Sequence, residues 1–176
     1  RSDTSVFASS RTYSQPAGTD LKDVVGLFFT GIPSSFAISL GETSTLQGIS
    51  NGPPESYRYN FGLVETSGQA ATVAVTVRDE YGTPIGSSVQ YSLGAYEARQ
   101  VNAFAGFPVT VSTRNGRLDV TVTSGLGKVI TYGTLVAGTP ENPGSNDSIG
   151  FEMSFRNLLA GGVQSVNGLT GAIRIQ

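Results

Sequence analysis

Hydrophobic and polar residues alternate along most of this chain, which is the pattern of β-strands half-buried in a sheet. The runs at 71–78 and 88–93 alternate most regularly, and the segment between them contains two glycines and a proline. We therefore predict a β-hairpin with a longer loop. The predicted inward positions are Val73, Val75, Val77, Val89, Tyr91 and Leu93.

A second hairpin is predicted at Asn115-Gly116, which lies between two alternating runs. Asn-Gly favours a two-residue turn because both residues accept a positive φ. The run at 129–136 then returns as a further strand. We expect the strand before the Asn-Gly pair, the strand after it and this returning strand to form a meander.

Further short apolar segments are separated by turn residues, and no segment shows a persuasive helical period. Short strands at regular spacing predict an all-β fold, an antiparallel β-sandwich, with a closed barrel as the alternative. These additional predicted strands cover 5–13, 24–32, 36–40, 58–66, 149–155 and 170–175.

A boundary is predicted at 51–56, where the sequence reads NGPPES. It separates an N-terminal strand arm, residues 1–56, from a sandwich body with a C-terminal strand, residues 57–176. The arm is apolar enough that we expect it to pack on the body, because a free linker would be more polar.

The amino-acid composition indicates a neutral, hydroxyl-rich surface. Charged residues make up 14% of the chain, below the usual quarter, and 23 glycines are present. This balance suits a secreted or assembling β protein. The formal net charge of −2 and the scattered basic residues argue against a nucleic-acid partner. The longest apolar run, 24–29, is too short for membrane insertion.

The chain contains no His and no Cys. This excludes a Ser-His-Asp or Cys-His arrangement within the chain and the common zinc sites. We therefore expect no enzyme activity, no metal and no cofactor. Asp79-Glu80 is an adjacent carboxylate pair, but neighbouring residues at a turn usually point apart into solvent.

A resemblance covers most of residues 8–137. The stretches ASSRTYSQPAGT, GLFFTGIPSSFAISLGETSTLQGI, YRYNFGLVETSGQAATVAVTVRDEYGTPIG and ITYGTLVAG resemble immunoglobulin-like β-sandwich modules of secreted, multi-domain bacterial surface proteins. The resemblance implies an extracellular or cell-surface location and transfers no catalytic residue. The sequence departs from the usual module after Gly138.

The two terminal segments occur in the reverse of the order that such modules have. GAIRIQ lies at the end of this chain and SVFASSRTY near its start. The ends could pair within one chain, or between chains in a manner similar in principle to donor-strand pilus subunits. In the second case the interface candidates are Val6, Phe7, Ile173 and Ile175. Because the chain begins at Arg1 rather than Met, we also expect a leader or upstream segment.

The leading functional hypothesis is a structural subunit of a surface assembly, a head-to-tail filament of copies of this chain. The alternative is an adhesive or carbohydrate- or protein-binding module with a glycan or host-surface ligand. The candidates for a sugar-binding platform are Tyr13, Tyr57, Tyr59, Tyr81 and Tyr96. Asn146 begins a glycosylation sequon. Glu141, Asn146 and Asp147 carry oxygen ligands of the type that calcium takes, although they are also ordinary loop formers.

Overall fold

A computed structural model of the chain describes residues 8–14, 17–18, 20, 25–52, 57–138, 148–156, 165–166 and 169–170. Their regular structure is antiparallel β-sheet, with one short 3-10 turn, η2 (Ser34–Phe36). The prediction of an all-β, antiparallel fold is therefore confirmed. No helix in this part of the chain is long and apolar enough to cross a membrane.

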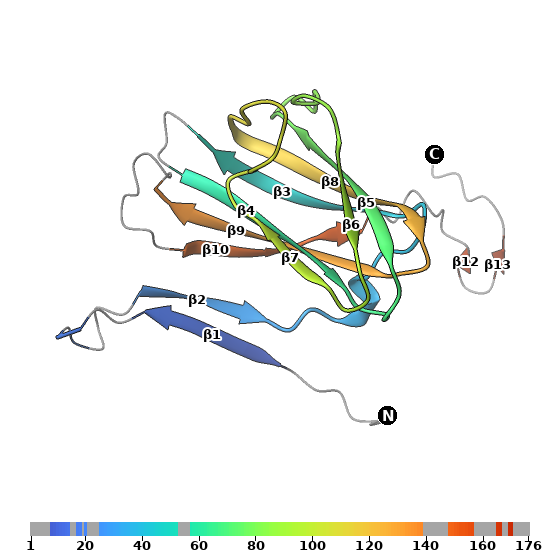
Figure 1. The fold of residues 1–176 in the computed structure, drawn as a ribbon, viewed down its shortest axis with the longest axis horizontal. Coiled ribbons are helices and arrows are strands. Elements are labelled where there is room, and N and C mark those ends of the chain that lie inside the picture. The colour runs from blue at the N-terminus through green and yellow to red at the C-terminus, as the bar shows by residue number, and fades with distance from the viewer. Residues whose placement is uncertain are drawn as a thin grey trace.

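Two larger sheets form the body, and Figure 1 shows them stacked face to face. The four-stranded sheet has the order β10 (Ser148–Met153), β9 (Val129–Ala137), β4 (Tyr57–Glu65) and β7 (Ala98–Val101). The five-stranded sheet has the order β11 (Phe155–Arg156), β3 (Thr43–Asn51), β8 (Thr113–Gly125), β5 (Ala71–Arg78) and β6 (Val89–Leu93). Two small hairpins complete the described strands: β1 (Ser9–Ser14) with β2 (Val25–Thr30), and β12 (Ser165–Val166) with β13 (Leu169–Thr170).

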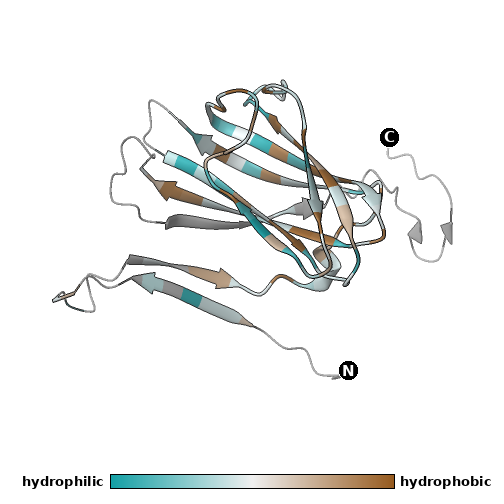
Figure 2. Cartoon of the chain, viewed as in Figure 1, coloured by the Kyte–Doolittle hydropathy of each residue, from teal (hydrophilic) through white to brown (hydrophobic). Residues whose placement is uncertain are grey.

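The core lies between the two larger sheets. Along β5, buried and half-buried residues alternate without a break, as period two predicts, and Figure 2 shows hydrophobic and hydrophilic positions along the strands. An aromatic cluster fills the centre: the ring of Phe61 lies 6.1 Å from that of Tyr91 and 5.7 Å from that of Phe104. Because β4 carries Phe61 and β6 carries Tyr91, these rings join the two sheets.

Two tyrosines of the four-stranded sheet lie over glycines on the neighbouring strand. The ring of Tyr59 on β4 covers Gly133 of β9, and the ring of Tyr132 on β9 covers Gly62 of β4. A Cβ at either glycine would overlap the tyrosine ring. The two small residues therefore let β4 and β9 pair closely while each carries a large aromatic side chain.

The predicted turn at Asn115-Gly116 is wrong. Both residues lie inside β8, and neither has a positive φ. β3 on one side and β5 on the other hold this part of β8 extended: Gly116 pairs with Ile49, and Arg117 pairs with Arg78. The pairing partners on both sides outweigh the local preference of the Asn-Gly pair for a turn.

Two other predicted strands differ from the structure. The strand predicted before the Asn-Gly pair is irregular over 107–112, where Val111 is buried. In the predicted strand 36–40, Phe36 ends η2 and the rest contains only an isolated bridge from Ile38 to Val129. β3 falls in the range assigned to the N-terminal arm, yet it lies inside the five-stranded sheet and brings Leu46 and Ile49 to the core.

Replacing Gly133 by Ala tests the close approach of β4 and β9. The new methyl group would overlap the Tyr59 ring, which is buried and stacked 6.3 Å from Phe104. We expect a loss of about 2 kcal/mol in the free energy of unfolding, measured by urea denaturation. Gly94→Ala is the control, because a Cβ there meets only a Glu97 carboxylate oxygen at 3.6 Å. Equal stability of both variants would contradict this packing.

Candidate functional site

The interface and modification candidates drawn from the termini and the late loop lie outside the described residues. These are Val6, Phe7, Ile173, Ile175 and Asn146, together with Glu141 and Asp147. Three other regions bear on function: the N-terminal hairpin, the outer face of the five-stranded sheet, and one end of the sandwich around Glu65.

The N-terminal hairpin, β1 with β2, is a sheet of its own. β2 lies beside β10, the end strand of the four-stranded sheet, but no ladder of hydrogen bonds joins them (Figure 1). The backbone N–H of Gly31 donates to the carbonyl of Ala8 at 2.7 Å and closes the open end of the hairpin. The hairpin is therefore joined to the body by the chain that leads from β2 to η2 and not by a β-ladder.

The two faces of this hairpin differ. Ser10 and Phe29 are register partners, and both line an open hollow of about 360 Å3 against the four-stranded sheet. Register partners share a face, so Arg11 and Phe28 belong to the opposite one. Phe28 is 56% exposed there, and Tyr13, two residues from Arg11, is 61% exposed. The hairpin thus presents two aromatic side chains outward.

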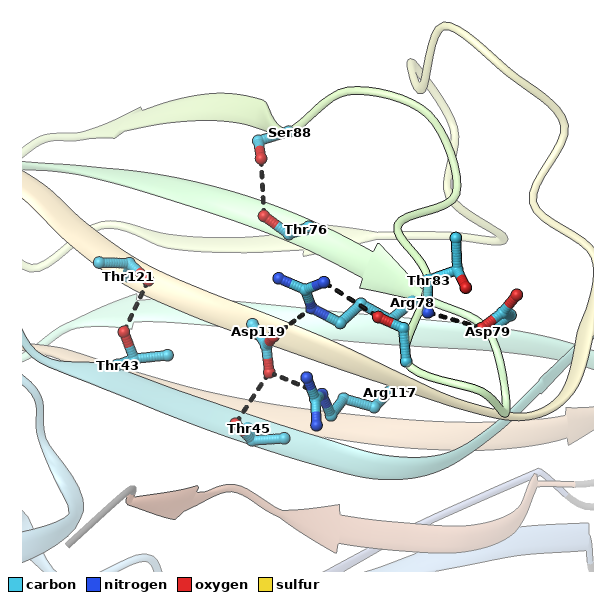
Figure 3. A network of polar contacts seen from close by, with 11 residues as sticks. Thr43, Thr45, Thr76, Arg78, Asp79, Thr83, Ser88, Arg117, Asp119 and Thr121 are labelled. Atoms are coloured by element: carbon cyan, nitrogen blue, oxygen red, sulfur yellow. Dashed lines mark hydrogen bonds and ion pairs between the residues drawn. The ribbon is translucent and has the colours of Figure 1, made fainter. Parts of the chain in front are cut away.

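The outer face of the five-stranded sheet carries a polar surface, called the polar face below. Register places Thr45, Asp119 and Thr76 in one line across β3, β8 and β5. On the polar face, pairs of hydroxyl groups join neighbouring strands. The hydroxyls of Thr43 on β3 and Thr121 on β8, for example, lie 2.7 Å apart (Figure 3). The polar face consists of Thr43, Thr45, Gln47, Thr72, Thr76, Arg78, Gln90, Ser92, Arg117, Asp119, Thr121 and Thr123.

Asp119 is the centre of the polar face. Its Oδ2 accepts a hydrogen bond from Nε of Arg78 at 2.9 Å, and its Oδ1 lies 3.3 Å from Nε of Arg117. The Thr45 hydroxyl donates to the same Oδ1 at 3.0 Å. One carboxylate therefore joins three strands, and it separates two arginines that the register would otherwise place side by side (Figure 3).

A polar hollow of about 200 Å3 opens at the arginine end of the polar face. It forms because β5 ends at Arg78, whereas its neighbour β8 reaches back to Thr113 and the register of β3 shifts near Gly48. The predicted Asp79-Glu80 turn and the Asn115-Gly116 pair thus meet at one place. The hollow is lined by Gln47, Gly48, Asp79, Glu80, Gly82, Asn115, Gly116 and Arg117.

Glu65 forms the third region, at the opposite end of β5 from the polar hollow. Its side chain is 1% exposed. Its carboxylate accepts hydrogen bonds from three separate loops: from the backbone N–H groups of Ser67, Gly68, Tyr96 and Lys128, and from the Ser67 hydroxyl. We call this arrangement the Glu65 clamp. Sequence analysis missed it, although Thr-Ser-Gly after a strand-end glutamate is a loop signal.

The clamp holds a charged carboxylate inside the protein. Burial by itself raises the pKa of Glu65. The hydrogen bond from the Ser67 hydroxyl and those from backbone N–H groups outweigh burial and lower the pKa from 4.5 to about 2. Because the groups that solvate the charge belong to fixed loops, the clamp can stabilise structure but offers no proton at neutral pH.

These regions offer hydrogen-bonding groups and apolar surface. In the described part of the chain, no three His, Cys, Asp or Glu side chains gather as a metal site. The two hollows differ in character, since the one under the hairpin is lined mainly by apolar side chains and the polar hollow by carboxylates, amides and an arginine. Comparison with protein-family models, with curated proteins and with solved structures found no match to this chain.

The Glu65 clamp predicts a specific pH dependence. Its folded pKa of about 2 lies below the ordinary 4.5, so its contribution is complete above pH 4.5 and is lost as the pH falls toward 2. At pH 7, Glu65→Gln should cost about 3 kcal/mol in the free energy of unfolding, because it replaces an accepting oxygen with an amide donor.

Urea denaturation at several pH values measures this difference. The difference in the free energy of unfolding between the wild-type protein and Glu65→Gln should shrink steadily below pH 4.5. Glu80→Gln, at an exposed glutamate, is the control and should follow the wild-type curve. A gap that stays constant down to pH 2 would show that the clamp does not depend on ionised Glu65.

The Asp119 network predicts coupling between strands. Asp119→Asn should destabilise the protein by about 1 kcal/mol, because the ion pairs are partly solvated. A double-mutant cycle with Arg78→Met measures the pair directly by urea denaturation. We expect the double variant to lose less stability than the sum of the single variants. Strict additivity would mean that the pair contributes nothing.

Proposed function

We propose that this chain is a structural subunit of an extracellular surface assembly, in which copies join through their N-terminal hairpins by exchange or addition of strands. The observation that carries the proposal is the hairpin β1–β2, which lies beside β10 without a hydrogen-bonded ladder and exposes Tyr13 and Phe28 outward. Exposed aromatic pairs of this kind favour a protein partner.

Exchange of the hairpin between copies is energetically cheap. A two-stranded hairpin is marginally stable by itself and needs a surface to pack on. The same packing can be made on a neighbouring copy, so exchange costs little beyond the loss of freedom on association. The open hollow beneath Phe29 also leaves part of the apolar surface of the body unfilled.

Strand addition is the second route to the same assembly. β10 forms the end of the described four-stranded sheet, and an edge strand presents backbone groups that a further strand can pair with. The terminal segments with Val6, Phe7, Ile173 and Ile175 are candidates for such strands under the sequence-based hypothesis. Repeated head-to-tail contacts would give a filament.

We also propose that the fold is an immunoglobulin-like module. Two antiparallel sheets around one core support an immunoglobulin-like module. The hydroxyl-rich polar face and the low share of charged residues, 14%, support an extracellular location and close approach of copies.

Light scattering of the purified chain over a range of concentrations tests the proposal. We expect species heavier than the 18.3 kDa monomer, in amounts that rise with concentration. The double variant Tyr13→Asp, Phe28→Asp should shift the distribution to the monomer, because it places charges in the proposed contact. Tyr81→Asp is the matched control, at a tyrosine that is 86% exposed on the body. A wild-type monomer at every concentration would overturn the proposal.

Cross-linking distinguishes exchange of the hairpin from simple surface contact. The chain has no cysteine, so Ser10→Cys and Val64→Cys introduce two thiols that line the same hollow from the hairpin and from β4. Mixing the two single-cysteine variants and adding a short bismaleimide should give a cross-linked dimer if hairpins exchange. A variant that carries both cysteines in one chain serves as the comparison. If this variant cross-links within one chain and the mixture gives no cross-linked dimer, each hairpin stays on its own body and hairpins do not exchange.

A further inference from the structure

We propose that the polar hollow at the arginine end of the polar face binds one unit of a neutral saccharide, with Tyr81 stacked against the sugar ring. The proposal goes beyond the assembly role and does not depend on it. It rests on the side chains that line the hollow, on the exposure of Tyr81 and on the balance of charge.

The lining side chains match the hydrogen-bonding needs of a sugar. Sugar hydroxyls both donate and accept, and vicinal hydroxyls suit planar groups with two adjacent polar atoms. Carboxylates at Asp79 and Glu80 accept, the guanidinium of Arg117 donates, and the amide of Asn115 does both. Asp79 is held in place, since its Oδ1 accepts hydrogen bonds from the backbone of Tyr81 at 3.0 Å and of Thr83 at 2.8 Å.

Tyr81 is an exposed aromatic residue next to the hollow in the sequence. It stands between Glu80 and Gly82, which both line the hollow, and it is 86% exposed, so in the proposed complex we place its ring over the sugar at the rim. An aromatic ring this exposed contributes nothing to the core, whereas its apolar face and polar hydroxyl suit the mixed surface of a sugar ring. The turn that Asp79 fixes therefore carries both hydrogen-bonding groups and a stacking platform.

Three glycines line the hollow: Gly48, Gly82 and Gly116. The space beside Gly48 and Gly82 is open, since a Cβ there would have no atom within 4 Å, and both residues have a positive φ that favours glycine. At Gly116 a Cβ would lie 2.5 Å from the carbonyl oxygen of Arg78, so that position requires glycine. The volume of about 200 Å3 is below the range of about 300–1,000 Å3 for larger ligands, which favours a single sugar unit.

The charges and the hydrogen-bond donors around the hollow together favour a neutral ligand. Asp79 and Glu80 would repel a phosphate, a sulfate or an acidic sugar. A cation would be attracted by these carboxylates, but it would use none of the donors of Arg117 and Asn115. The carboxylate pair alone does not reach the ligand number of a calcium site. A ligand rich in hydroxyls and without charge fits these groups best.

NMR titration of the full chain tests the proposal. The probes are glucose, galactose, mannose and N-acetylglucosamine, added separately up to millimolar concentrations, with acetate and lysine as charged comparisons. We expect at least one neutral sugar to shift the amide signals of 47–48, 79–82 and 115–117 and to give saturation-transfer signals. No shift with any of the four sugars, or shifts confined to other residues, would overturn the proposal.

Variants separate stacking from general surface binding. Tyr81→Ala should weaken binding of the responding sugar about tenfold, and Asn115→Ala should weaken it measurably. Tyr96→Ala is the matched control, at a tyrosine 73% exposed at the opposite end of β6, and it should bind like the wild-type protein. Unchanged amide spectra away from the hollow show that each variant is folded. Equal binding by Tyr81→Ala and Tyr96→Ala, or a stronger response to lysine or acetate than to any sugar, would contradict the proposal.

Discussion

The buried charge of Glu65 is the constraint on which one whole end of this sandwich depends. A carboxylate removed from water must be solvated by the protein itself, and here the donors come from the loops after β4, after β6 and after β8. These loops connect strands that belong to different sheets. Their positions relative to one another are therefore fixed by one side chain rather than by packing alone, and Tyr96 adopts a positive φ of 57° beside it.

The remaining stability comes from how closely the two sheets approach. Phe61, Phe104 and Tyr91 fill the space between them, and the aromatic-on-glycine pairs of β4 and β9 let large rings lie flat against the backbone. Because the inward positions carry the apolar residues, the outward positions of the five-stranded sheet are free to be polar. The polar face is thus a consequence of strict alternation, and Asp119 prevents its two arginines from repelling one another.

The two functional proposals concern surfaces outside this core. The N-terminal hairpin lies beside the body without joining either of the two larger sheets, so no β-ladder fixes it there. The polar hollow occupies a different place, where β5 stops and β8 continues. The two proposals therefore use separate surfaces. Copies of the chain would make an apolar contact at the hairpin, and a small polar ligand would bind in the polar hollow. A subunit that assembles through one surface keeps the other available.

Local sequence determined the parts of this protein that depend on alternation: β4, β5, β6 and β9, the inward positions Val73, Val75 and Val77, and the all-β antiparallel class. Tertiary structure decided the rest. Asn115-Gly116 is extended because β3 and β5 pair with it on both sides, a long-range effect that no short window contains. The Glu65 clamp and the polar hollow are likewise invisible in the sequence, because each gathers residues from segments far apart in the chain. Strand formation is encoded by neighbouring residues, whereas a site needs register, and register is set by the partner strands.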